Sequence, residues 1–468
     1  MKPRWQIPRA RAHCGAALAL VLASPLHAAE TQDATPTAAS APTIDLEALR
    51  DAVRQQQQTI DQQQERIDAL VDQIEHVEKE ASATGPGKLS WEGYGVINYQ
   101  RYDFYENSQD DTAESRARTD LERIVLAPTY DFGNGYAFVA EIEFEHGGTG
   151  ATVEFEQEEA GEFETEVEKG GEVVLEQAHL QIEVSPWLNW RLGEIVVPFG
   201  MVNTHHQPSQ YFTLERSLAE TSLIASVWHE TGVELYGAVG QLRYQLQVVT
   251  ALDSSGFSGP EFVRGGMQGR LEFDNADDLA VVGRADYSLA PGVLLGGAVY
   301  YGDSAGNRPR KNLDVSAAVT LLEVHGRYER GPLIVRGQYI SGTIENADEV
   351  TRANYTTYNA GELGISKTPV GSKAVAYFVE AGYDVMPLFG RSRDRLDVFA
   401  RYDAYDTHAD TEGTIVEVAR YDREAITAGL NYQPMPGIVF KAEYSQREHA
   451  GTTGNEQEVY GLGLGFEF

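Results

Sequence analysis

The chain ends on the stretch Glu458-Val459-Tyr460-Gly461-Leu462-Gly463-Leu464-Gly465-Phe466-Glu467-Phe468, which decides the fold class. The large apolar side chains of this stretch recur with strict period two, at Tyr460, Leu462, Leu464, Phe466 and Phe468. Such alternation indicates a β-strand with one broad apolar face. A strand that closes a barrel in lipid must present such a face, whereas a soluble sheet would have to cover it. We therefore expect a transmembrane β-barrel.

The same alternation recurs from Lys88 onward, in segments about as long as the 9 to 11 residues that a tilted strand needs to cross a bilayer. Short turn-like breaks occur near 133–135, 185–186, 237–241, 290–292, 330–332, 386–394 and 433–437. Longer polar loops lie near 105–116, 147–172, 200–228, 253–278, 303–312, 342–371, 406–422 and 448–456. These connections alternate and join 16 antiparallel strands, as short periplasmic turns and long external loops require. The alternative is 18 strands, if a hairpin at 269–274 extends into the wall.

The N-terminal region predicts export. Residues 1–29 resemble a secretory signal, with a basic start, an apolar core and a cleavage site near Ala28. Cys14, the only cysteine, lies within it, so we expect no disulfide and no thiolate metal site. No run of 18 apolar residues follows, which excludes membrane-spanning helices.

The net charge of -34 makes nucleic acid an unsuitable partner. The carboxylates either solvate the exterior or, where outer loops cluster them, recruit divalent cations shared with lipopolysaccharide.

A coiled coil is predicted between two linkers, at 30–43 and 81–87. Within residues 44–80 the a and d positions of a heptad run from Leu46 to Val77 without a break in register, with Gln56 and Gln63 as the polar exceptions. The alternative is a single amphipathic helix. An even number of strands places this segment in the periplasm, where it would join protomers or touch peptidoglycan. The seam does not define the number of chains.

A barrel of this size leaves an aqueous lumen, so passage of solutes is the expected activity and no enzyme or cofactor is predicted. The third outer loop, 200–228, is too apolar for an exposed loop and is expected to fold back against the wall as the constriction. It contains His205, His206, Glu215, Arg216 and Glu220. Strand parity places these basic residues in the lumen: Arg191, Arg243, Arg284, Arg327, Arg336, Arg401 and Lys441. Acidic residues join them there, at Asp286, Glu329, Asp397, Asp403 and Glu443, which indicates either wall-stiffening ion pairs or a transverse field.

Three segments resemble the phosphate-selective porins O and P: 191–200 (RLGEIVVPFG), 214–218 (LERSL) and 230–237 (ETGVELYG), together with the terminal aromatic strand. The resemblance covers the predicted barrel, 88–468. It implies a homotrimeric, 16-stranded outer-membrane porin with an inward third loop, whose terminal residues Tyr460, Phe466 and Phe468 are read by the barrel-assembly machinery. That family's basic constriction is not matched, because 200–228 contains one Arg and no Lys. Phosphate or other anions therefore remain only one candidate class of solute.

Two further interpretations are open. An outer-membrane enzyme with a plugged barrel and a non-conducting adhesion or structural barrel would share the fold. His205 and His206 are adjacent and point in divergent directions, so we predict polar loop residues and no metal site. The acidic segment 154–172 predicts a disordered or cation-bridged external loop, not a specific site.

Overall fold

The computed structural model describes residues 88–105, 110, 112–147, 154–158, 162–166, 171–269, 273–359, 368–391 and 393–468. The predicted leader, linkers and coiled coil lie outside these residues. Among the described residues, no helix is both long and apolar enough to cross a bilayer.

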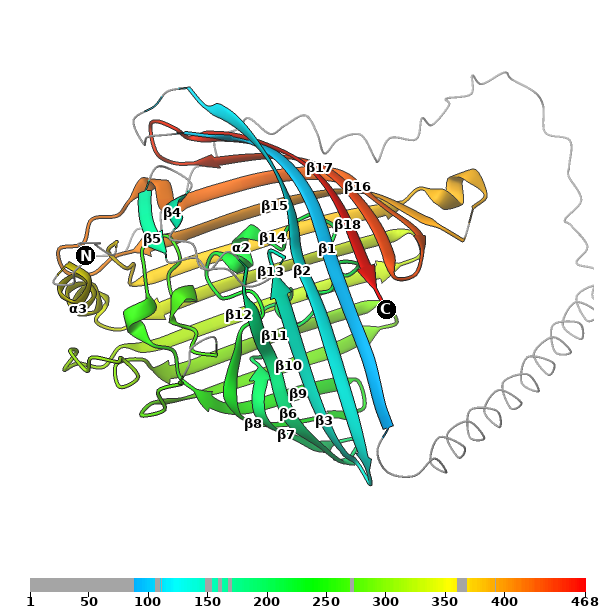
Figure 1. Cartoon of the computed structure of the whole chain (residues 1–468), viewed down its shortest axis with the longest axis horizontal. Helices are drawn as coiled ribbons and strands as arrows, with labels where there is room; N and C mark the ends of the chain where they lie inside the picture. Colours follow the sequence, from blue (N-terminus) through cyan, green and yellow to red (C-terminus); the bar gives the residue numbers. More distant parts are fainter. Residues whose placement is uncertain are drawn as a thin grey trace, which may run out of the picture. The chain divides into compact units, whose positions relative to one another are not determined.

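The described strands confirm a closed antiparallel barrel of 16 strands (Figure 1). The wall strands are β1 (Lys88–Phe104), β2 (Glu114–Gly133), β3 (Tyr136–Glu145), β6 (Val173–Ser185), β7 (Leu188–Val196), β8 (His229–Val239), β9 (Leu242–Thr250), β10 (Leu279–Ala290), β11 (Val293–Asp303), β12 (Ala318–Arg330), β13 (Leu333–Ile344), β14 (Lys373–Asp384), β15 (Arg395–Asp410), β16 (Asp422–Met435), β17 (Ile438–His449) and β18 (Glu456–Glu467). Each strand pairs with its neighbours, and β18 closes the ring on β1.

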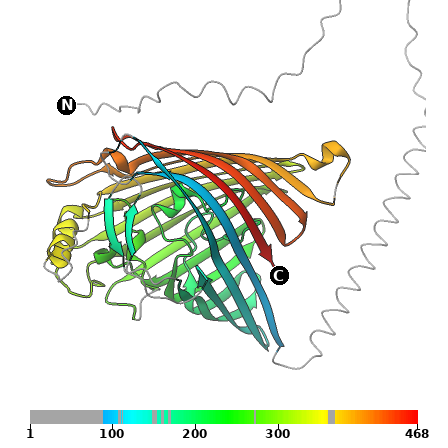
Figure 2. The ribbon, with the colours of Figure 1, turned by 45° about the horizontal axis from the view of Figure 1, so that its top comes forward.

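The remaining elements lie in the connections. A two-stranded hairpin, β4 (Glu154–Glu158) and β5 (Glu162–Glu166), interrupts the acidic loop between β3 and β6. The helices are α2 (Leu218–Thr221), α3 (Ala347–Asn359), η1 (Ser254–Gly256), η2 (Arg264–Gly266), η3 (Met386–Phe389) and η4 (Ala419–Tyr421). Figures 1 and 2 show α3 and the β4–β5 hairpin at one end of the barrel and η3, in a short turn, at the other. Long and short connections are thus segregated, as predicted.

The boundaries of some connections differ from the prediction. The loop after β11 runs to residue 317, because 313–317 does not pair, whereas β15 continues to Asp410 and shortens the loop that follows it. The alternative of 18 wall strands is wrong: none of the described residues among 269–274 is in a strand.

The terminal strand has the two faces that its sequence predicts. Tyr460, Leu462 and Phe468 are 50%, 56% and 63% exposed on the outside, whereas Val459 on the inner face is 2% exposed. Exposure on this scale would be costly for a surface in water but is suited to lipid. The inner face of β18 also carries three successive small residues, Gly461, Gly463 and Gly465, which lie under the third loop.

The C-terminal residue completes the seam of the barrel. Phe468 N donates to Gly93 O and Gly93 N donates to Phe468 O, both at 2.9 Å. The Phe468 ring covers Gly93, because a Cβ on that glycine would lie 2.7 Å from Phe468 Cζ. The terminal residue is therefore part of the closing contact between β18 and β1.

Deletion of Phe468 is expected to reduce barrel insertion more than conductance. The deletion removes two backbone hydrogen bonds, worth about 1 kcal/mol each, from the last contact that closes the ring. Heat-modifiable barrel in outer-membrane fractions and single-channel conductance measure the two effects. Phe440→Ala is the control, because Phe440 is 48% exposed on β17, opposite Leu464, and takes no part in the contact between β18 and β1. Wild-type insertion of the truncated chain would contradict this role.

Candidate pore constriction

The third loop, 197–228, leaves the wall at β7 and returns at β8. Its base is closed by Asn203, which donates to Val197 O at 2.8 Å and accepts from Trp228 N at 2.6 Å. In the ring order, β15 lies eight strands from β7 in either direction, so the two stand opposite each other. Ala219 N in α2 donates to Asp403 of β15 at 3.2 Å. The loop therefore extends from β7 to β15 on the opposite side of the ring. Figure 1 labels α2, the helix of this loop, next to β14 and β15.

The loop packs against the glycines of β18. A Cβ on Gly463 would lie 2.1 Å from Leu214 Cδ1, and one on Gly465 would lie 2.5 Å from Pro208 Cβ. Backbone donors of the loop are satisfied by wall carboxylates: Leu214 N donates to Glu443 at 2.6 Å, and Ser209 N donates to Glu467 at 2.9 Å. The small residues on the inner face of β18 thus make room for the loop.

Lys441 of β17 holds the same segment from the wall. Its ammonium donates to Tyr211 O at 2.9 Å and to Thr213 O at 2.8 Å, and lies 3.8 Å from the centroid of the Tyr211 ring. The residue is only 6% exposed. Two carbonyl acceptors and an aromatic face compensate for part of the cost of burying the charge.

Two wall arginines share one carboxylate beneath the loop. Glu380 of β14 is 2.7 Å from Arg401 Nη2 and 3.1 Å from Arg336 Nη1. Arg401 also donates to Thr213 Oγ1, and Arg336 donates to the loop carbonyl of Gln210. Asp403 accepts from Ser217 Oγ at 2.7 Å. This charged network ties the middle of the loop to β13, β14 and β15.

Glu220 organises the start of the loop from within. Its carboxylate accepts the N–H groups of Met201, Val202 and Asn203 at 2.9, 2.9 and 2.6 Å. Burial raises the pKa of the Glu220 carboxyl above its usual value, and these N–H donors oppose that rise. Arg284 of β10 then donates to Gly200 O at 2.8 Å.

The apolar residues that marked this loop in the sequence form a core with the wall. Phe199, Leu223, Ile224 and Trp228 are buried together with Tyr300 of β11. The rings of Trp228 and Tyr300 have centroids 5.0 Å apart. The expectation that the loop folds back against the wall is therefore confirmed by its contacts.

The predicted site residues separate into two groups. Four basic wall residues bind the loop: Arg284, Arg336, Arg401 and Lys441. The other three make no hydrogen bond to the loop within the described residues: Arg191 pairs with Glu234 at 3.1 Å, Arg327 pairs with Glu329, and Arg243 is exposed.

Within the loop, the predicted residues have different surroundings. Glu215 accepts from Gln100 at 2.6 Å and pairs with Arg447 at 2.9 Å. Arg216 is buried and donates to Ser226 Oγ. His205 is exposed, whereas His206 approaches Glu141 of β3 at 3.5 Å.

Sequence reasoning did not single out Glu380 or Thr213, and it named Leu214 only as part of the segment 214–218. The inward parity of Glu380 on β14 could have identified that residue. Nothing in the sequence pairs Thr213 or Leu214 with wall residues more than 180 positions away.

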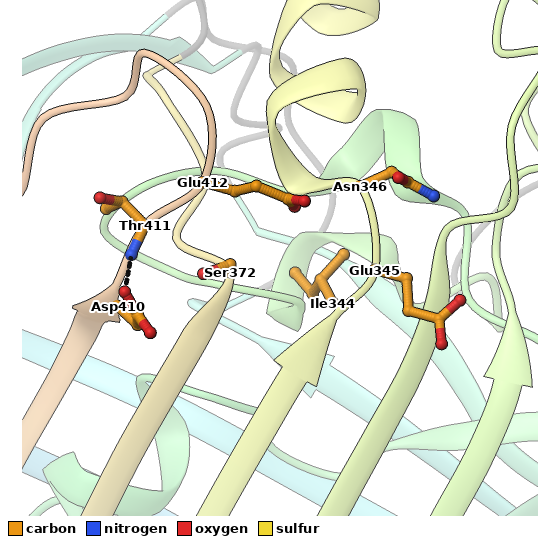
Figure 3. A pocket seen from close by; sticks show the side chains of 7 residues that line it. All are labelled: Ile344, Glu345, Asn346, Ser372, Asp410, Thr411 and Glu412. Carbon is orange, nitrogen blue, oxygen red and sulfur yellow. Dashed lines mark hydrogen bonds between the residues drawn. The ribbon is translucent and has the colours of Figure 1, made fainter. Parts of the chain in front are cut away.

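A polar hollow lies at the loop end of the barrel, lined by Ile344, Glu345, Asn346, Ser372, Asp410, Thr411 and Glu412 (Figure 3). Glu412 points across it toward the start of α3 and accepts the N–H of Ala347 at 2.9 Å. Asp410 accepts the N–H of Thr411 at 2.9 Å. These carboxylates are used to cap α3 and the end of β15, which is a structural role.

Comparison with known proteins finds similar chains and a family. The chain is 26% identical over 369 residues to an uncharacterised protein of Aquifex aeolicus, covering 78% of this chain and 77% of that one. It is similar in structure to the outer-membrane channel DcaP of Acinetobacter baumannii (11% identity, 82% of this chain, 98% of that chain, TM-score 0.48). It is also similar to an anion-selective porin of Comamonas acidovorans (13% identity, 82% and 100%, TM-score 0.46). The family model for phosphate-selective porins O and P matches residues 95–468. Because this match covers most of the chain, the chain belongs to the phosphate-selective porin O and P family of outer-membrane channel proteins.

Proposed function

We propose that the third loop is the constriction of a water-filled channel through which small hydrophilic solutes and ions diffuse. The observation that carries the proposal is the bridge from β7 to β15, on opposite sides of the ring, made by hydrogen bonds of Ser217 and Ala219 to Asp403. Residues held across the lumen in this way define its narrowest part. The charged groups that remain accessible beside the loop set which ions pass.

The burial of the basic wall residues under the loop supports weak ion selectivity. Arg336, Arg401 and Lys441 are 9% exposed or less, and their donors are directed at loop carbonyls, Thr213 Oγ1 and Glu380. These cations are occupied with holding the loop and are not free to bind a passing anion. We therefore propose a general diffusion channel and not a channel dedicated to phosphate.

Assembly forms part of the same proposal. We infer a homotrimer in outer-membrane lipid and lipopolysaccharide, inserted by the barrel-assembly machinery, with residues 44–80 as a periplasmic coiled coil that joins protomers or contacts peptidoglycan. The heptad seam supports the coiled coil. Planar-bilayer recordings test both parts: insertion should give conductance steps in closely spaced threes. A silent bilayer from folded protein would contradict the channel, and single independent steps would contradict the trimer.

The reversal potential in a salt gradient is expected to lie close to zero in chloride and to shift little when phosphate replaces chloride. The reason is that Arg336, Arg401 and Lys441, which bind the loop, are not accessible to ions in the channel. Arg327→Gln, which removes one of the more accessible lumenal cations, should shift the potential toward cation preference, and Lys441→Gln should shift it less. A strongly anion-selective current that phosphate blocks would contradict this expectation.

A further inference from the structure

A cluster of possible metal ligands lies where the third loop meets the wall on the β3 and β6 side. Glu141 of β3, Glu176 of β6 and His206 of the loop each offer one ligand atom, and these atoms all lie within 4.8 Å of one another. His206 Nε2 and Glu141 Oε1 are 3.5 Å apart. Two ligands about 2.1 Å from a tetrahedral ion stand about 3.4 Å apart, so this pair already has the required spacing.

A β-bulge directs Glu176 into the cluster. In the pairing of β3 with β6, Glu141 faces Gln177 and the next residue, Ile142, faces Leu175, which leaves Glu176 as the extra residue. Because the bulge interrupts the alternation, Glu176 is fully buried and the adjacent Gln177 also binds Glu141 on the inner side of the wall. Bulges of this kind re-aim side chains and are over-represented next to functional sites.

The surrounding hydrogen bonds leave the ligand atoms available. His206 Nδ1 lies 3.0 Å from Asn203 O, and since a carbonyl only accepts, Nδ1 carries the proton and Nε2 has the free lone pair in the neutral ring. Gln177 donates to Glu141 Oε2, which leaves Oε1 facing the histidine. Metal-binding histidines commonly have their second nitrogen fixed by a backbone carbonyl in this way.

The surroundings of the Glu176 carboxylate also point to a bound cation. Both of its oxygens are buried and accept no hydrogen bond from an N–H or hydroxyl group in the described structure, and the carboxyl group of Glu143 lies within reach of a shared proton. Its electrostatic neighbours are mainly Glu143 and Glu141, with Arg216 as the opposing charge. Arg216 donates to Ser226 through Nη1, whereas its Nε and Nη2 are buried without a hydrogen-bond partner in the described structure, and Arg123 pairs with Glu143 at 2.7 Å. Arg216 opposes the charge of Glu176 without a hydrogen bond to it, so the lone pairs of this buried carboxylate are open to a proton or a bound cation.

We propose that Glu141, Glu176 and His206 bind a divalent transition-metal ion, with Zn²⁺ as the best match, and that this ion fastens the third loop to the wall. Two carboxylates and one imidazole form a mixed oxygen and nitrogen set that suits Zn²⁺ better than Mg²⁺ or Ca²⁺, which prefer oxygen ligands alone. The fourth position is left for water. The bond through His206 would connect the loop to β3 and β6, on the side of the lumen away from β15.

Zinc binding to the purified full-length protein tests the proposal. Protein stripped with a chelator is titrated with Zn²⁺ in excess Mg²⁺, which saturates oxygen-only sites on the acidic outer loops. We expect one Zn²⁺ per chain. Glu176→Gln and His206→Asn should weaken its affinity by more than about 100-fold, and Gln177→Ala by about 10- to 100-fold, as loss of a supporting residue does. His205→Asn is the matched control and should bind like the wild type.

A zinc-edge spectrum and the zinc uptake of the variants distinguish this site from zinc bound to the outer loops and from a protonated Glu176 without metal. The zinc-edge absorption spectrum should show one imidazole nitrogen and carboxylate oxygens at about 2.0–2.2 Å in the wild type. Heat-modifiable gel mobility confirms that each variant is folded. Equal uptake by the wild type, Glu176→Gln and His206→Asn would place the ion on the outer loops and overturn the proposal. Absence of saturable uptake would overturn it too, leaving a protonated Glu176 and an ordinary contact between His206 and Glu141.

Discussion

Gly463→Val is expected to lower single-channel conductance, because the added side chain displaces Leu214 from β18 into the lumen. A Cβ at this position would lie 2.1 Å from Leu214 Cδ1, and the paired wall has less freedom to move than the loop does. Overpacking of this kind costs about 1–3 kcal/mol, so heat resistance should fall as well. Conductance steps in a planar bilayer and the temperature of heat modification measure the two effects.

A compensating substitution, added to Gly463→Val, provides the control. Leu214→Ala removes the clashing methyl groups, so Leu214→Ala combined with Gly463→Val should recover most of the conductance that Gly463→Val loses. The two residues are in contact, so their effects should not add. If the double variant conducts as poorly as Gly463→Val alone, the loop does not lie against β18 at this point.

Arg401→Met is expected to increase open-channel noise and to lower heat resistance. The substitution leaves Glu380 with Arg336 as its remaining partner, deprives Asp403 of its nearby cation 4.0 Å away, and removes the bond to Thr213. Breaking a buried ion pair by removing one partner costs about 3–5 kcal/mol. A loop released from β15 should fluctuate during recordings.

Arg243→Met is the matched control for Arg401→Met. Arg243 also lies on the wall, in β9, but it is exposed and makes no ion pair in the described part of the chain. Its replacement should change stability by no more than about 0.5 kcal/mol and leave the noise unchanged. Equal noise in the two variants would mean that loss of lumenal charge, and not release of the loop, is responsible.

The wall could be predicted from the sequence because lipid and water impose a period of two on every strand. Tyr460, Leu462 and Phe468 face outward as the alternation requires, and the turn-like breaks give the strand number. Connections were less predictable. The start of β12 at Ala318 and the end of β15 at Asp410 depend on how far each strand pairs with its neighbour, which the alternation does not mark.

The roles of the lumenal charges could be predicted only in part. Parity placed Arg401 and Lys441 inside the barrel, but not their burial under the loop, because their partners Thr213 and Tyr211 are about 190 and 230 positions away in the chain. Opposed charged tracks were one of the two interpretations of the lining. In the structure, Glu380, Arg336 and Arg401 form ion pairs that hold the loop, and the interpretation as opposed tracks stays a prediction.

The bulge at Glu176 shows how one local irregularity escapes a pattern-based prediction. The adjacent polar residues Glu176 and Gln177 break the alternation of β6, which is the only trace that the bulge leaves in the sequence. In the sequence, His205 and His206 could be compared only with each other, because they are adjacent in the chain. The structure instead brings His206 to two carboxylates on different strands.

Cross-linking of Leu214→Cys with Gly463→Cys tests the central claim, that the third loop lies across the lumen against the terminal strand. The chain's only natural cysteine is in the predicted leader, and Leu214 Cγ, whose place a cysteine sulfur would take, lies 3.6 Å from a Cβ at position 463, so a small shift brings the two sulfurs to bonding distance. Oxidation of the double variant in outer membranes should give an intramolecular disulfide in most chains, with wild-type conductance, because the bond fixes the loop where it already lies. Two free thiols that both react with an impermeant maleimide would contradict the account.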